Sequence, residues 1–173
     1  SDVVNSKLNI KKGLEKVAKN LGNIGGHVAE GAEWMLRHVK NKMDDFANKD
    51  LYFEIDVKNP KGRRTADLKV CENGKEIGCT YFEFKSVKEV PPGNFNDQFV
   101  KDLLNDDVND LSQIKWIFDG EKIKKADLEA LKNRIDALDI PEPAWKKFGM
   151  SSAEELKEKL KTDVIFNDIF KVE

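Results

Sequence analysis

Two carboxylates and a lysine in the middle of the chain could perform metal-assisted chemistry together. Glu83 and Lys85 are two residues apart in a short apolar run, and Asp67 precedes them in the previous apolar segment. Successive side chains of a strand point to opposite faces, so Glu83 and Lys85 leave the sheet together, away from Phe82 and Phe84. Two carboxylates around a divalent cation can activate water, and an ammonium group can stabilise charge on a phosphate. The residue types therefore indicate phosphodiester hydrolysis.

Asp67 joins this pair only if its strand meets the Glu83 strand in one particular register. If a wide loop separates the cysteines, Asp67 lies opposite Glu83 with Cβ atoms about 5 Å apart, and Cys71 lies opposite Cys79. A tight turn at Asn73-Gly74 would instead send Asp67 and Glu83 to opposite faces. The predicted site depends on the wide loop, and the sequence leaves open whether the cysteines are bonded.

Strand periodicity surrounds these residues. Apolar and polar residues alternate over residues 51–57, 65–70 and 81–85. The turns between these segments contain Asn59-Pro60-Lys61-Gly62 and Asn73-Gly74, which favour chain reversal. The pattern predicts an antiparallel meander of three strands, each with one apolar face. Glu54 and Asp56 fall on a polar strand face and are expected to be a solvated edge.

Helical periodicity flanks the meander on both sides. Residues 3–21 predict a helix that ends at Gly22, and residues 28–46 predict a longer one. After Pro91-Pro92-Gly93 a helix is expected to run to about Leu111, which makes the next strand, at 115–118, parallel to the third. Further helices are expected over 124–139, where Pro141 and Pro143 break the pattern, and after Ser151-Ser152.

Composition narrows the class of protein. A chain of 173 residues is the size of one domain, and 30 basic against 32 acidic residues give a net charge of −2. A global basic field for binding nucleic acid is therefore excluded, and any attraction must be local. The one dense basic run, around the first turn of the meander, is either a solvated hairpin tip or a loop that contacts phosphate: Lys58, Lys61, Arg63, Arg64 and Lys69. No segment is long and apolar enough to cross a bilayer.

The same residues resemble a known family. Asp67 followed by Glu83-Phe84-Lys85 resembles the PD-(D/E)XK motif of restriction-endonuclease-like nucleases, with Ala66 in place of the usual proline. Gly26-x-x-Ala29-Glu30 resembles the archaeal Holliday-junction resolvase branch, in which a helical glutamate supplies another metal ligand. The resemblance makes Glu30 the first choice for that ligand and Glu33 the second. It also implies a polar contribution from the helix after the Glu-x-Lys strand, with Gln98 and Lys101 as candidates.

The resemblance implies an α/β fold (an α+β mixed sheet) with a nuclease core. An N-terminal helical arm is expected over 1–25 and a nuclease domain over 26–173, with its core at about 26–119 and a C-terminal helical extension at about 120–173. The implied cofactor is a divalent metal, Mg²⁺ or Mn²⁺ first and Zn²⁺ as an alternative. The implied metal ligands are Asp67, Glu83 and Glu30; the other catalytic residues are Lys85 and Gln98; and the implied nucleic-acid contacts are Lys58, Lys61, Arg63, Arg64 and Lys101.

The general character of the chain is similar to that of C-terminal toxin domains of bacterial polymorphic toxins, including contact-dependent growth inhibition effectors. This similarity implies a domain of a larger secreted or cell-surface effector that cleaves DNA or tRNA in the cytoplasm of a target bacterium. Its partners would be nucleic acid and a cognate immunity protein. Two alternatives stay open: a resolvase-like or repair nuclease, and a non-catalytic α/β interaction domain in which Asp67, Glu83 and Lys85 form a surface ion-pair network.

Overall fold

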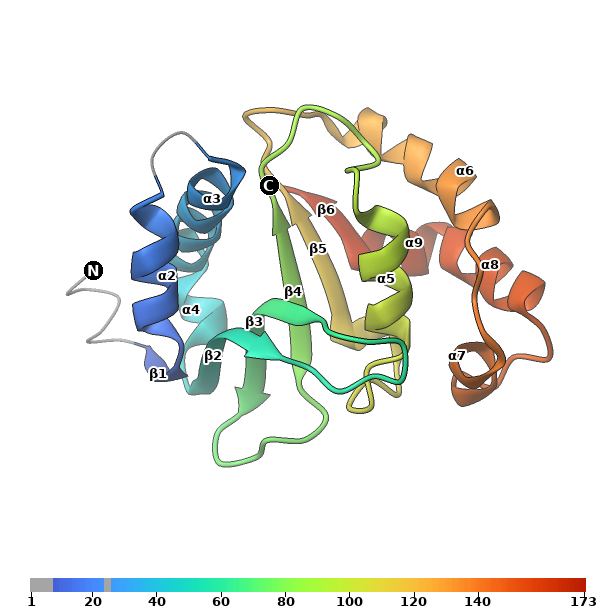
Figure 1. Ribbon diagram of the computed structural model, residues 1–173, viewed down its shortest axis with the longest axis horizontal. Coiled ribbons are helices and arrows are strands. Elements are labelled where there is room, and N and C mark those ends of the chain that lie inside the picture. The colour runs from blue at the N-terminus through green and yellow to red at the C-terminus, as the bar shows by residue number, and fades with distance from the viewer. Residues whose placement is uncertain (1–7, 24–25) are drawn as a thin grey trace.

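A computed structural model describes residues 8–23 and 26–173, which form a six-stranded mixed sheet between two layers of helices (Figure 1). The strands lie in the spatial order β1-β2-β3-β4-β5-β6, which is also their order in the chain. Their bounds are β1 Asn9–Lys12, β2 Lys49–Asp56, β3 Thr65–Glu72, β4 Thr80–Lys85, β5 Ile114–Phe118 and β6 Phe170–Val172.

The helices divide between the two faces of the sheet. One face is covered by α2 Leu14–Leu21, α3 His27–Asn41 and α4 Met43–Phe46. The opposite face is covered by α5 Phe95–Leu103, η1 Leu111–Gln113, η2 Lys125–Glu129, α6 Ala130–Asp136, α7 Glu142–Lys147, α8 Ala153–Lys161 and α9 Asp163–Ile169. Among the residues with described positions, no helix has the length and apolar character needed to span a membrane.

The centre of the sheet confirms the predicted meander. β2 pairs with β3 and β3 with β4, both antiparallel, and β5 lies parallel beside β4 after the α5 crossover. The predicted order of a helix, three antiparallel strands, a helix and a parallel strand is therefore present. The prediction of one apolar face for each strand is wrong, because helices cover both faces; Tyr52 and Phe53, for example, are neighbours in β2 and are both buried.

The N-terminal segment differs from the expected helix. Residues 9–12 form β1, which pairs parallel with β2, and only α2 is helical; residues 3–7 of the expected helix lie outside the described part of the chain. Gly13 makes the connection between β1 and α2 with a φ of 91°, and a Cβ atom there would lie 1.9 Å from the carbonyl oxygen of Phe53. Only glycine fits this close approach. The segment therefore belongs to the sheet rather than to a separate helical arm.

The C-terminal half also corrects the expected element boundaries. α5 ends at Leu103 rather than near Leu111. Pro141 and Pro143 do not simply break a helix: Pro141 precedes α7 and Pro143 lies in its first turn, where a missing N–H costs little. The last predicted helix is divided into α8 and α9, and β6 then returns to pair parallel with β5. The Ser152 hydroxyl accepts a hydrogen bond from the Glu155 N–H, so the predicted serine cap of α8 is confirmed.

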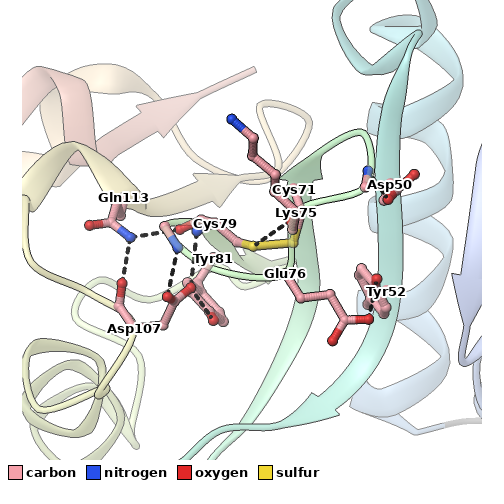
Figure 2. Close-up of a disulfide and its surroundings, with 11 residues drawn as sticks. Asp50, Tyr52, Cys71, Lys75, Glu76, Cys79, Tyr81, Asp107 and Gln113 are labelled. Atoms are coloured by element: carbon pink, nitrogen blue, oxygen red, sulfur yellow. Dashed lines mark hydrogen bonds between the residues drawn. A yellow bond between two sulfur atoms is a disulfide. The ribbon is translucent and has the colours of Figure 1, made fainter.

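The register between β3 and β4 is the one the predicted site requires. Leu68 pairs with Phe82 and Val70 with Thr80, which places Asp67 opposite Glu83. Cys71 and Cys79 lie opposite each other and form a disulfide that closes the loop between the strands (Figure 2).

The carboxylate of Asp107 fixes this loop from outside the hairpin. It accepts hydrogen bonds from the N–H groups of Gly78 at 2.7 Å and Cys79 at 3.0 Å, and from the Tyr81 hydroxyl at 2.8 Å. The wide loop is thus held by the disulfide, by the Asp107 carboxylate and by further hydrogen bonds, among them one from the Gly74 N–H to Asp50 Oδ2 at 2.9 Å (Figure 2).

Candidate active site

A cavity of about 350 Å³ opens beside the ends of β3 and β4 and brings the predicted residues together. Asp67, Glu83 and Lys85 all line it. Much of the remaining lining comes from α3, including His27, Gly31 and Met35, and Glu54 contributes from β2. The pocket therefore holds three carboxylates, one ammonium group and the imidazole of His27.

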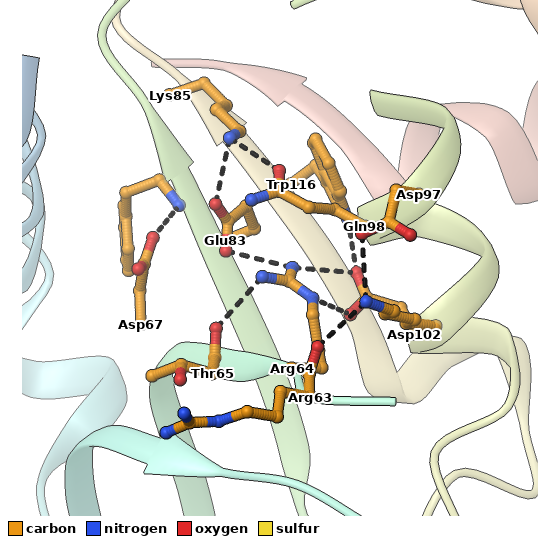
Figure 3. Close-up of polar contacts among 12 residues, drawn as sticks. Arg63, Arg64, Thr65, Asp67, Glu83, Lys85, Asp97, Gln98, Asp102 and Trp116 are labelled. Atoms are coloured by element: carbon orange, nitrogen blue, oxygen red, sulfur yellow. Dashed lines mark hydrogen bonds and ion pairs between the residues drawn. The ribbon is translucent and has the colours of Figure 1, made fainter. Parts of the chain in front are cut away.

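Asp67 lies between the two strands at the point where their pairing stops. Its carboxylate accepts a hydrogen bond from the N–H of Phe84 at 2.8 Å, so a side chain binds a backbone donor of β4 beyond the last paired residues (Figure 3). Burial raises the pKa of Asp67 well above its usual value, repulsion from Glu83 raises it further, and the Phe84 N–H opposes the shift. The positive groups around Asp67 therefore do not offset the cost of burying its charged form.

Glu54 is the residue at this cavity that the sequence pattern assigned to a solvated edge. It lies across from Asp67 on β2, and the amide of Asn20 in α2 donates a hydrogen bond to its carboxylate at 3.4 Å. Burial raises its pKa, and repulsion from Glu83 acts in the same direction. Glu54 has a φ of 50°, a left-handed conformation that is rare for a residue other than glycine. No sequence signal in a strand of regular alternation marks such a kink.

Glu83 and Lys85 form an ion pair, as their spacing on one strand face predicts. The ammonium nitrogen of Lys85 lies 3.0 Å from Glu83 Oε2 and donates a hydrogen bond to Gln98 Oε1 at 2.7 Å (Figure 3). Lys85 also stands over the Trp116 ring at 5.4 Å. The expectation that α5 supplies a polar partner to the Glu-x-Lys strand is confirmed in position by Gln98.

Arg64 is buried, whereas the basic run around it predicted a side chain on the surface of the loop. Its side chain is 5% exposed and lies inside the protein, where its guanidinium binds Asp102 and Glu83. Burial alone would lower the pKa of Arg64, but the carboxylates of Asp102 and Glu83 outweigh burial and raise it. Arg64 therefore does not present its charge on the outer surface with the other basic residues of the loop, which corrects its assignment as a nucleic-acid contact.

The predicted helical metal ligands do not reach the cavity. Glu30 is exposed on α3, and its carboxylate pairs with the ammonium of Lys122 at 2.5 Å. Glu33 is exposed and does not line the pocket. The helix instead contributes His27 and small or apolar side chains such as Gly31 and Met35. Glu54 is the third carboxylate that lines the cavity, beside Asp67 and Glu83.

The other cations that were predicted to contact nucleic acid divide into exposed ones on the loop between β2 and β3 and an engaged one on α5. Lys58, Lys61 and Arg63 are exposed. Lys101 is engaged: its ammonium donates a hydrogen bond to the carbonyl of Arg63 at 2.9 Å and pairs with Asp97 at 3.0 Å. Lys101 thus anchors the loop to α5 rather than offering a free charge.

The donor set of the cavity suits a hard divalent cation. Carboxylate oxygens are the ligands that Mg²⁺ and Mn²⁺ prefer, and Glu54, Asp67 and Glu83 supply them. Within residues 8–23 and 26–173, no three His, Cys, Asp or Glu side chains already stand at metal-binding separation. Glu54 and Asp67 make no ion pair with any other described residue. Burial raises the pKa of each carboxyl and repulsion from Glu83 raises it further, and a cation between them would offset both effects. The residues therefore fit the metal chemically.

Comparison of the chain with protein-family models, with curated proteins and with solved structures finds no match.

Proposed function

We propose that this chain is a metal-dependent nuclease that hydrolyses phosphodiester bonds of DNA or tRNA. The observation that carries the proposal is the meeting of Glu54, Asp67, Glu83 and Lys85 at one cavity, which unites carboxylates for a cation with an ammonium group for a phosphate. The PD-(D/E)XK-like order of elements around this cavity supports the same conclusion.

Each residue of the cavity has a distinct part in this mechanism. Glu54, Asp67 and Glu83 would hold the divalent cation, which when bound supplies charge neutralisation and a more acidic water. Lys85 stabilises the negative charge that develops on the phosphate, and Gln98 holds its ammonium group in place. The hydrogen bond from the Phe84 N–H holds the Asp67 carboxylate between β3 and β4, where their pairing stops.

The proposal is tested by cleavage of plasmid DNA and total tRNA with Mg²⁺, Mn²⁺ or Zn²⁺. Glu83→Gln and Lys85→Ala should each lower the rate by about 100-fold or more, the usual cost of removing such a group. Glu89→Gln and Lys88→Ala change exposed residues of the same types a few positions away and should cleave like the parent. Cleavage that survives chelation of the metal would remove Asp67 and Glu83 as ligands.

A non-catalytic interaction domain is the second candidate, and one observation favours it. Both carboxylate oxygens of Glu83 already have cationic partners, Arg64 and Lys85, as in a structural ion-pair network. Such a network would leave DNA and tRNA intact in every metal tested. The resolvase alternative is weakened, because Glu30, the residue that carried that resemblance, is exposed and paired with Lys122.

We also propose that the domain acts as a toxin delivered into a target bacterium and blocked by an immunity protein. The Cys71–Cys79 disulfide supports this route, since such bonds form and persist outside the reducing cytoplasm. Induced synthesis of the parent chain inside bacteria should arrest growth, whereas Glu83→Gln should not. Normal growth with the parent chain would count against the toxin role.

A further inference from the structure

A buried chain of alternating charges runs from α5 to the cavity. Arg64 Nε donates to Asp102 Oδ1 at 2.9 Å, and Arg64 Nη2 donates to Glu83 Oε1 at 3.0 Å and to Asp102 Oδ2 at 3.3 Å (Figure 3). Arg64, Glu83 and Asp102 are 7%, 6% and 9% exposed. Because water screens these charges poorly, each one affects its neighbour strongly.

The far end of this chain is fixed by groups that never reach the cavity. Trp116 Nε1 donates to Asp102 Oδ2 at 2.9 Å, and Arg64 Nη1 donates to the carbonyl of Thr65 at 2.9 Å. Arg64 donates four hydrogen bonds in total, and these fix the plane of its guanidinium group between α5 and the start of β3. Glu83 is held at Oε1 by this rigid donor, and its Oε2 pairs with the ammonium group of Lys85 at 3.0 Å, on the side of the cavity that both residues line.

We propose that Arg64 and Asp102 are positioning residues for Glu83. Arg64 holds one carboxylate oxygen of Glu83 so that the other oxygen can bind the metal. Asp102 neutralises part of the positive charge of Arg64. This inference rests on the proposed function. Without Asp102, the full charge of Arg64 would fall on Glu83 alone and would compete with the metal for that carboxylate. A residue of the helical layer thus adjusts metal affinity without touching the metal.

The test compares two identical chemical changes on the same helix. Asp102→Asn removes the buried carboxylate beside Arg64, whereas Asp97→Asn removes an exposed carboxylate that pairs with Lys101. Titration calorimetry with Mn²⁺, in the absence of nucleic acid, should show about 10- to 100-fold weaker binding for Asp102→Asn, the usual effect of a partner outside the ligand shell. Asp97→Asn should bind Mn²⁺ like the parent.

A second variant and a second readout separate positioning from a general loss of structure. Arg64→Lys keeps the positive charge but cannot bind Asp102 and Glu83 with one planar group, so it should also weaken Mn²⁺ binding; it replaces Asp102→Asn if that variant does not fold. In both variants cleavage should recover at saturating Mn²⁺, which a distorted active site would not allow.

The outcomes distinguish this inference from the proposed function. If the parent binds Mn²⁺ and Glu83→Gln does not, but Asp102→Asn binds as tightly as Asp97→Asn, the positioning role is overturned and the nuclease proposal stands. If the parent binds no Mn²⁺, or if Glu83→Gln binds Mn²⁺ as tightly as the parent, the metal site is refuted. The positioning inference is then refuted as well.

Discussion

At the scale of single residues, Glu54 adopts a conformation that strands rarely contain. A left-handed φ at a residue other than glycine costs on the order of 1–3 kcal/mol and persists only where the surrounding structure enforces it. Beyond this kink the sheet faces reverse, because Phe53 and Leu68 pack in the α3 layer whereas the next pair, Ile55 and Ala66, packs in the α5 layer. The strain therefore turns the Glu54 carboxylate into the cavity.

The position of Glu54 leads to a prediction that separates it from the helical glutamates. Glu54→Gln should lower metal-dependent cleavage by about 10- to 100-fold, because a ligand or its close neighbour loses its charge. Glu30→Gln should cleave nucleic acid like the parent, since Glu30 faces solvent and Lys122. Cleavage assays at limiting Mn²⁺ would show the difference, and the reverse ranking would restore Glu30 as the ligand.

Asp67 should lower the stability of the metal-free chain at neutral pH. Its folded-state pKa is raised above the ordinary 3.8, so the folded chain holds a proton that the unfolded chain has released. The stability linked to this group is complete below pH 3.8 and is lost as the pH rises through the folded-state pKa. The charged carboxylate of Asp67 therefore lowers the stability of the folded chain at neutral pH.

Asp67→Asn should therefore raise the melting temperature at pH 7, in buffer with a chelator, by about 2–4 °C, the shift that 1 kcal/mol produces in a domain of this size. The asparagine oxygen can still accept the Phe84 N–H. The gain should shrink at pH 4, where the parent carboxyl is already becoming neutral. Asp44→Asn, at an exposed position, serves as the control; an equal gain at both pH values would exclude the charge as the cause.

At the scale of elements, the β3–β4 hairpin depends on its covalent closure. The disulfide joins cysteines eight positions apart and restricts the unfolded chain. Replacing both with Cys71→Ser and Cys79→Ser should lower the free energy of unfolding by about 2–3 kcal/mol, as expected for a loop of this length. Urea unfolding with and without reductant provides the measurement. A parent chain that loses no stability under reductant would contradict the prediction.

Most of the central elements could be predicted because their signals are local. Alternation and turn residues predict β2, β3 and β4, and the condition on the wide loop predicts the register that pairs Cys71 with Cys79. β1 and β6 are four and three residues long, and they are strands because β2 and β5 offer them a partner. Neither short run carries enough periodicity to predict such long-range pairing.

The candidate site was predictable to the extent that it follows from strand geometry. Asp67, Glu83 and Lys85 line one cavity as their spacing indicates, and Gln98, which the resemblance suggested, accepts a hydrogen bond from Lys85. Glu54 could not be found, since a backbone kink reverses the faces beyond it. Arg64 could not be separated from the exposed cations beside it, because its burial depends on Asp102, which lies 38 positions away in the chain.

At the scale of the whole molecule, the fold separates buried positive side chains from exposed ones. Arg64 and Lys85 are enclosed with carboxylates between β4 and α5, whereas Lys58, Lys61 and Arg63 project from the loop that Lys101 ties to the same helix. The net charge of −2 leaves the loop as the concentrated basic region near the site. Under the proposed function, the exposed cations would bind the nucleic acid and the enclosed residues would act on its backbone.

For the proposed nuclease, this separation predicts how cleavage responds to ionic strength. Dissolved ions screen exposed charges beyond about 10 Å at 0.1 M salt but act weakly on buried pairs. From about 50 to 200 mM salt, KM for nucleic acid should therefore rise steeply while kcat stays nearly constant. Lys61→Ala should reduce the slope of log KM against log salt by about 1, and Lys75→Ala, on the disulfide-closed loop, should leave it unchanged. A kcat that falls with salt as steeply as KM rises would mean that the buried charges of Arg64 and Glu83 are open to solvent ions during turnover.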